Sequence, residues 1–132
     1  MPNLPIWFHR AEAACLFVAA TALYFVLHAA GWWFVLLFFS FDLSILGYLA
    51  GPRIGAVCYN LFHNLALPLL CLALGLLSYK IIWLDSLALI WVAHIGFDRM
   101  LGFGLKYPDG FRHTSLNLAA AAPAKPTKNS GR

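Results

Sequence analysis

The sequence predicts an all-α integral membrane protein, built as a single bundle of four transmembrane helices. Hydrophobic residues make up 62 % of the 132-residue chain and charged residues only 11 %, whereas a soluble domain carries about 25 % charged residues. The apolar residues fall into four runs, each close to the roughly 20 residues that a helix needs to span a bilayer. This composition excludes an ordinary soluble globule, a disordered chain and a free nucleic-acid-binding domain.

Short breaks divide the four runs into separate helices. Gly31 ends the first run, and a break at residues 51–53 ends the second, because Pro52 suits a helix start and disfavours helix at the residue before it. A turn at residues 78–80 ends the third run. The predicted spans are residues 11–30, 32–50, 54–77 and 81–101. A short interfacial segment completes the domain at residue 118, and residues 119–132 form a disordered basic tail.

Two local features modify this helix pattern. Pro68 lies inside the third run and leaves the carbonyl of Asn64 without its usual helical donor. Gly47, Gly51 and Gly55 recur every four residues, as in small-residue helix contacts. A proline splits this series, so it predicts a tight turn first and helix dimerisation second.

The positive charges set the predicted orientation. With four spans, both termini and the second loop share one side of the membrane, which holds eight of the nine Lys and Arg residues. Because cytoplasmic loops carry the positive excess, we expect both termini in the cytoplasm. Expected partners are membrane lipids, with a homo-oligomer left open and no nucleic acid. The eight residues are Arg10, Arg53, Arg99, Lys106, Arg112, Lys125, Lys128 and Arg132, against Lys80 on the other side.

Polar residues inside the spans indicate a site, because a charge at the bilayer centre costs about 2.5–3.5 kcal/mol on insertion scales. Asp42 lies in the second span, His63 in the third, and His94 and Asp98 in the fourth. The helical rise places all four about 5–14 Å from the cytoplasmic ends of their spans. This agreement in depth across three helices predicts one shared cluster.

Helical spacing also pairs these residues. His94 and Asp98 are one turn apart, as are Tyr59 and His63. A carboxylate beside an imidazole can fix its tautomer and raise its basicity, so we expect His94 to carry a proton and Asp98 to orient it. The candidate catalytic residues are His94, Asp98 and Asp42; the candidate ligand-binding residues are His63, Asn60 and Tyr59, with Arg53, Arg99 and Lys106 as a basic rim for an anionic group.

Binding of a divalent metal is a second possible role for the same four side chains. Asp42, His63, His94 and Asp98 could supply nitrogen and oxygen ligands. The sequence contains no HExxH motif and no cysteine pair with metal-ligand spacing, so the cofactor stays open. The three cysteines lie inside apolar runs and are expected to pack as small hydrophobes.

Five stretches around these positions carry a recognisable pattern. They are residues 42–48, 51–55, 59–60 with His63, 94–99 and 102–108. Together they resemble a bacterial family of small four-span membrane proteins, domain-of-unknown-function family 4260. The resemblance implies a family pattern that includes the polar positions, and it implies no activity. The family is expected to read Asp-Thr-His-Leu where this chain has His113-Thr114-Ser115-Leu116, which argues against a catalytic role for that region.

These observations favour a cytoplasm-facing intramembrane polar site for a small or lipid-like ligand, with acid–base or metal-assisted catalysis on it. A proton-coupled transporter or channel subunit would use the same residues as a relay. A structural or accessory membrane protein would use them only for hydrogen bonds between helices. A polar path across both leaflets would favour transport, whereas a closed-ended site would favour binding or catalysis.

Overall fold

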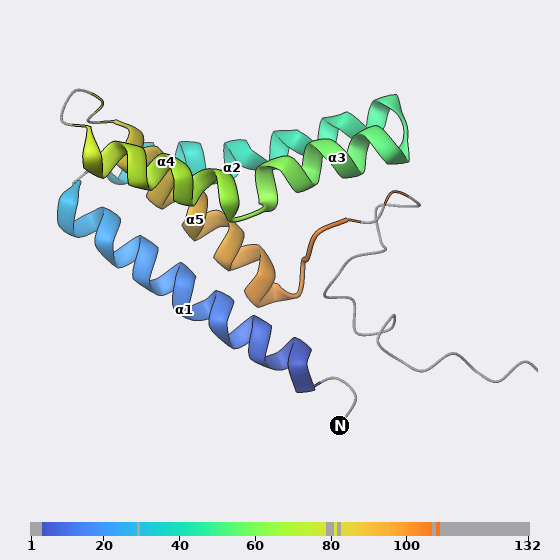
Figure 1. Ribbon diagram of the computed structural model, residues 1–132, viewed down its shortest axis with the longest axis horizontal. Helices are drawn as coiled ribbons and strands as arrows, with labels where there is room; N and C mark the ends of the chain where they lie inside the picture. Colours follow the sequence, from blue (N-terminus) through green and yellow to red (C-terminus); the bar gives the residue numbers. More distant parts are fainter. Residues whose placement is uncertain (1–3, 29, 79–80, 82, 107, 109–132) are drawn as a thin grey trace, which may run out of the picture.

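The computed structural model describes residues 4–28, 30–78, 81, 83–106 and 108, which form helices and no strand (Figure 1). The predicted all-helical architecture is confirmed. The loop at Lys80, the His113–Leu116 segment, Arg112 and the basic tail lie outside the described residues. The elements are α1 (Leu4–Leu27), α2 (Gly31–Ser40), the 3₁₀-helix η1 (Phe41–Ala50), α3 (Pro52–His63), α4 (Ala66–Leu77) and α5 (Leu84–Leu101).

Three helical stretches in the described part of the chain are long and apolar enough to cross a membrane. They correspond to the first three predicted spans and have the length and apolar composition that a membrane-spanning helix requires. The first begins at Leu4, seven residues earlier than predicted. Pro5 is compatible with this start, because the backbone N–H groups of a first helical turn have no intrahelical acceptor and proline lacks only that N–H. The stretches are Leu4–Leu27, Gly31–Ala50 and Pro52–Leu77.

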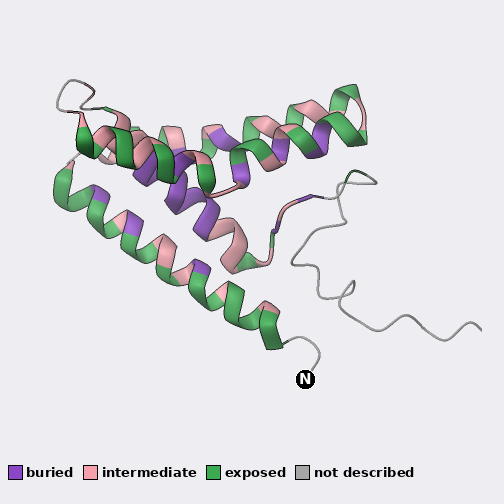
Figure 2. Cartoon of the chain, in the orientation of Figure 1, coloured by how far each residue is buried: buried purple, intermediate pink, exposed green. Residues whose placement is uncertain are grey.

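Helix α5, which corresponds to the fourth predicted span, lies at the centre of the molecule. It carries Asp85, Asp98 and Arg99, and ten of its 18 residues are buried. In Figure 2 its middle is coloured as buried, whereas large parts of the other helices are exposed. It packs against α1, α2 and α4. A Cβ added to Gly96 would lie 2.8 Å from the backbone nitrogen of Phe17, so α5 and α1 pack almost backbone to backbone.

Helices η1 and α3 form a tight antiparallel hairpin. Gly51 turns the chain between them with a φ of 121°, as the sequence predicts for this break. A Cβ added to Gly47 would lie 2.7 Å from Cβ of Cys58, and one added to Gly55 would overlap the ring of Tyr48. Gly47 and Gly55 therefore allow close packing within one chain. The hairpin extends away from the α1–α5 pair (Figure 1).

The third predicted span is broken rather than continuous, and Asn64 lies at the break. Pro68 is the cause, since its ring removes the helical donor to the carbonyl of Asn64 and crowds that carbonyl. Asn64 is extended, with a ψ of 155°. Its side chain accepts from the backbone nitrogen of Ala66 at 2.9 Å and donates to the carbonyls of Asn60 and Leu61, both at 2.8 Å. The break places His63 at the last residue of α3.

Candidate metal centre

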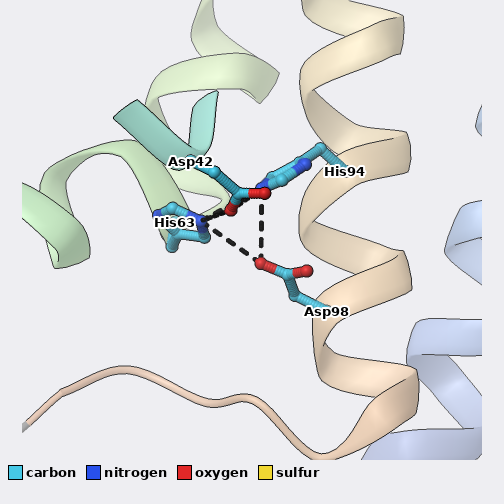
Figure 3. A group of neighbouring side chains, drawn as sticks. All are labelled: Asp42, His63, His94 and Asp98. Carbon is cyan, nitrogen blue, oxygen red and sulfur yellow. Dashed lines mark hydrogen bonds and ion pairs between the residues drawn. The ribbon is translucent and has the colours of Figure 1, made fainter. Parts of the chain in front are cut away.

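Four side chains from three elements converge on one point (Figure 3). Asp42 comes from the first turn of η1, His63 from the end of α3, and His94 and Asp98 from α5. One ligand atom from each lies within 4.8 Å of all the others. The predicted cluster is therefore present.

The distances between these atoms are short. His63 Nε2 lies 3.1 Å from His94 Nε2 and 3.2 Å from Asp98 Oδ2. His94 Nε2 lies 3.3 Å from both Asp98 Oδ2 and Asp42 Oδ1, and His63 Nε2 lies 3.8 Å from Asp42 Oδ1. Ligands bound to tetrahedral Zn²⁺ at about 2.0–2.1 Å are about 3.3 Å apart. Four of these five distances lie within about 0.2 Å of the spacing of a tetrahedral coordination shell.

Backbone geometry fixes the tautomer of His63. Its Nδ1 lies 2.8 Å from the carbonyl oxygen of Tyr59. A carbonyl only accepts hydrogen bonds, so Nδ1 carries the proton and donates. The Tyr59 ring stacks on the imidazole with centroids 3.8 Å apart and planes 6° from parallel. In its neutral form the ring directs the lone pair of Nε2 into the cluster, as metal-binding histidines do.

His94 supplies the most enclosed ligand atom. The residue is buried, and its ring packs against Phe38 and Phe41. Its Nδ1 is buried and has no hydrogen-bond partner among the described residues. Nε2 faces the carboxylates of Asp42 and Asp98. A metal cation or a proton bound at Nε2 would compensate their negative charge.

The cluster opens on one side. The side chains of His63, His94 and Asp98 are 4 %, 1 % and 14 % exposed, whereas that of Asp42 is 47 % exposed. A ligand therefore reaches the cluster from the Asp42 side. With both histidines neutral, the two carboxylates give the site a charge of −2, which is costly at low dielectric and matches one divalent cation.

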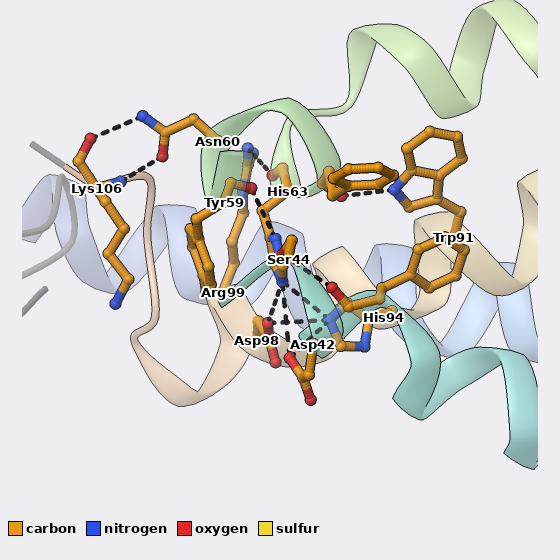
Figure 4. Close-up of polar contacts among 12 residues, drawn as sticks. Asp42, Ser44, Tyr59, Asn60, His63, Trp91, His94, Asp98, Arg99 and Lys106 are labelled. Carbon is orange, nitrogen blue, oxygen red and sulfur yellow. Dashed lines mark hydrogen bonds and ion pairs between the residues drawn. The ribbon is translucent and has the colours of Figure 1, made fainter. Parts of the chain in front are cut away.

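The broken third span is attached to α5 directly beside the cluster. The break frees the carbonyls of Phe62 and His63. Trp91 Nε1 donates to the carbonyl of Phe62 at 2.6 Å, and Arg99 Nη2 donates to that of His63 at 3.3 Å (Figure 4). These two contacts hold the end of α3, and with it His63, against α5. The sequence analysis missed Trp91; its position three residues before His94, facing a proline-broken helix, was the available signal.

Asn60 and Lys106 form a second contact between distant parts of the chain. Asn60 Nδ2 donates to the carbonyl of Lys106 at 2.7 Å, and Asn60 Oδ1 accepts from the backbone nitrogen of Lys106 at 2.5 Å (Figure 4). The Lys106 ammonium lies 4.7 Å from the ring centroid of Tyr59. Burial lowers the pKa of Lys106, and the Asp98 carboxylate acts in the opposite direction. Both polar atoms of the Asn60 amide are thus engaged with the backbone of the segment after α5.

The structure brings most of the predicted site residues together, with one exception. Tyr59 and Arg99 contact His63, and Lys106 contacts Tyr59. Arg53 is exposed in the first turn of α3, ten residues before His63 and therefore about 15 Å away along the helix. Arg53 is not part of the cluster's immediate surroundings.

Comparison with known proteins identifies one family. The family described as "Domain of unknown function (DUF4260)" matches residues 7–118. This range contains every residue of the cluster and confirms the resemblance seen in the sequence. No curated protein and no solved structure matches the chain.

Proposed function

We propose that this chain, which belongs to the DUF4260 family, is a membrane metalloprotein that binds one divalent transition metal and uses it on a small or lipid-like ligand. Asp42, His63, His94 and Asp98 are the proposed ligands. The observation that carries the proposal is the convergence of their four ligand atoms within 4.8 Å.

Charge and tautomer support a metal over simple hydrogen bonding between helices. In the neutral His63 ring, whose Nδ1 donates to the Tyr59 carbonyl, Nε2 is an acceptor that faces His94 Nε2 and two carboxylate oxygens. A single proton on His94 Nε2 can satisfy only part of this acceptor set. A mixed imidazole and carboxylate set suits Zn²⁺, Mn²⁺, Fe²⁺ or Co²⁺.

The chain's own groups would divide the work as follows. His63 and His94 would hold the metal from the buried side, and Phe38 and Phe41 pack on His94 to exclude water there. Asp98 would complete the buried side, and the more exposed Asp42 would face the incoming ligand. The metal supplies Lewis acidity toward a ligand oxygen or a bound water.

A proton relay across the membrane has less support. A second polar pair, His28 and Asp85, lies toward the opposite end of α1 and α5, with Nε2 and Oδ2 3.4 Å apart. Between this pair and the cluster, α5 presents the buried apolar residues Leu89, Ile90 and Val92. Along the middle of α5 no ionisable side chain therefore connects this pair to the cluster, which favours a closed-ended site.

Metal analysis of the purified protein tests the proposal. The chain would be purified in detergent, exposed to Zn²⁺, Mn²⁺, Fe²⁺ or Co²⁺, desalted and analysed by mass spectrometry of the elements. We expect one equivalent of one of these metals per chain, loss of that metal in His63→Ala, and full occupancy in the control His28→Gln. A wild-type protein that retains no metal, or a His63→Ala protein that retains as much as wild type, would overturn the proposal.

A further inference from the structure

A second candidate site lies between the N-terminal part of α1, the end of α5 and the break before α4. It is a cavity of about 300 Å³. Three polar side chains line it, His9, Glu12 and Arg99, together with apolar side chains that include Leu16 and Leu65. None of these residues belongs to the Asp42–His63–His94–Asp98 cluster, so the inference does not depend on a metal.

Arg99 and Glu12 carry opposite charges and line this cavity without pairing with each other. Within the described residues, no nitrogen of Arg99 lies within the 4.0 Å of Glu12 that defines an ion pair, and Glu12 instead lies 3.4 Å from His9. Arg99 has five N–H donors, and in the described part of the chain its one hydrogen bond is the 3.3 Å contact to the His63 carbonyl. The cavity therefore offers a guanidinium for an anion and, separately, a carboxylate for a cation.

The cavity also changes from polar to apolar along α1. His9 and Glu12 lie toward the helix end, with side chains 64 % and 72 % exposed. Leu16 lies seven residues beyond His9, about 10 Å deeper along the helix, and Leu65 lines the cavity from the break. A ligand that fits this gradient has a polar head at the surface and a hydrocarbon portion toward the membrane centre.

We propose that this cavity binds the headgroup of a zwitterionic aminophospholipid. Its phosphate binds Arg99, its ammonium group binds Glu12, and its glycerol and first acyl carbons contact Leu16 and Leu65. The volume lies at the lower end of the roughly 300–1,000 Å³ of ligand pockets, which suits a headgroup while the acyl chains stay in the bilayer. Glu12 disfavours a purely anionic lipid, because its carboxylate would lie beside that headgroup, whereas the ammonium group of a zwitterionic lipid would pair with it.

This charge pattern makes a selective lipid-binding experiment possible. The detergent-purified chain would be mixed with equal amounts of phosphatidylethanolamine and phosphatidylglycerol of the same acyl chains, and bound lipid would be counted by native mass spectrometry. We expect wild type to prefer phosphatidylethanolamine. Arg99→Gln should weaken binding of both lipids by about tenfold, the effect of one lost charge-assisted hydrogen bond, and Glu12→Gln should reverse the preference. Asp85→Asn, which removes a carboxylate outside the cavity, should keep it.

Two results would overturn the proposal. One is equal binding of the two lipids by wild type and by Glu12→Gln. The other is displacement of bound lipid by free phosphoethanolamine at equal concentration, which would identify a soluble zwitterion as the ligand. The metal content of Glu12→Gln is measured on the same sample, so that a change in lipid binding can be distinguished from a failure of the metal centre. Lost lipid preference with metal retained assigns the effect to the cavity alone.

Discussion

His63 and His94 face each other through their Nε2 atoms at a distance of 3.1 Å. The two residues belong to different helices, and the Tyr59 carbonyl holds the proton of His63 on the far side of its ring. Two imidazole lone pairs at this distance repel unless a proton or a metal ion lies between them. The contact therefore requires either a proton that forms a hydrogen bond between the rings or a bound metal ion, and removing the metal or one of its proposed ligands distinguishes the two.

Changing the buried acid should separate folding from function. In Asp98→Asn the amide oxygen can still accept a hydrogen bond, and membrane hydrogen bonds of this kind average only about 0.6 kcal/mol. Asp98→Asn and His94→Gln should therefore insert and unfold like the metal-free wild type, while losing metal and failing to complement a deletion strain. Thermal unfolding in detergent and complementation measure the two effects. If Asp98→Asn complements fully, chemistry at the cluster is excluded.

Metal removal should lower the stability only of those proteins that keep all four proposed metal ligands. A ligand at about 1,000 times its dissociation constant stabilises the folded state by about 4 kcal/mol. Chelation should therefore lower the unfolding temperature of wild type and of His28→Gln and leave that of His63→Ala unchanged. An equal effect of chelator on all three proteins would show that it acts elsewhere.

The Asn60 amide should matter for stability and not for metal content. It makes two hydrogen bonds to the Lys106 backbone, each with a net contribution of about 1 kcal/mol. Asn60→Ala should lower the free energy of unfolding by about 1–2 kcal/mol and retain one equivalent of metal. Metal loss in this variant at unchanged stability would instead assign Asn60 to the ligand site, as the sequence predicts.

Gly55 should tolerate no side chain. A Cβ at this position would overlap the ring of Tyr48 in η1, and overpacking of this kind costs about 1–3 kcal/mol. The matched control is Gly31→Ala, where the nearest atom to the new Cβ is Cε1 of Phe25 at 3.8 Å. Unfolding of both variants in detergent compares them directly. If Gly55→Ala is as stable as Gly31→Ala, the η1–α3 contact is looser than the structure has it.

Topology remains a prediction from charge, and reporter fusions test it. Fusions after Leu118 and within Pro52–Arg53 should report the cytoplasm, and a fusion at Lys80 should report the external side, because a four-span topology would place eight of the nine basic residues on one side. An external C-terminal reporter together with a cytoplasmic reporter at Pro52–Arg53 would mean that α5 does not cross the membrane, whereas both reporters external would mean an inverted orientation. The depth argument that placed the cluster near the cytoplasm would then fail too.

The cluster was predictable from the sequence because two physical constraints act on every residue in it. Charge is costly inside a membrane, so Asp42 and Asp98 stood out at once. The fixed rise of a helix then turned sequence position into depth, and depth brought residues of three helices together. Pairing within α5, between His94 and Asp98, followed from the helical repeat alone.

The details that depend on tertiary contacts were not predictable. Pro68 indicated an unsatisfied carbonyl at Asn64, yet nothing in the sequence said whether the helix would bend or break. The partner of Asn60 lies 46 positions away on a backbone segment, and such a pairing leaves no local pattern. The central position of α5 depends on how neighbouring helices cover it. The hydrophobicity of α5 alone does not indicate which helices those are.

The division of the metal centre between a hairpin and a later helix bears on biogenesis. Asp42 and His63 are carried by the η1–α3 hairpin, whose close glycine packing is made from consecutive segments, whereas His94 and Asp98 arrive with α5. A ribosome delivers the first pair well before the second. A nascent chain therefore presents half of the proposed coordination shell until α5 is inserted, and metal occupancy would mark completed assembly of the site.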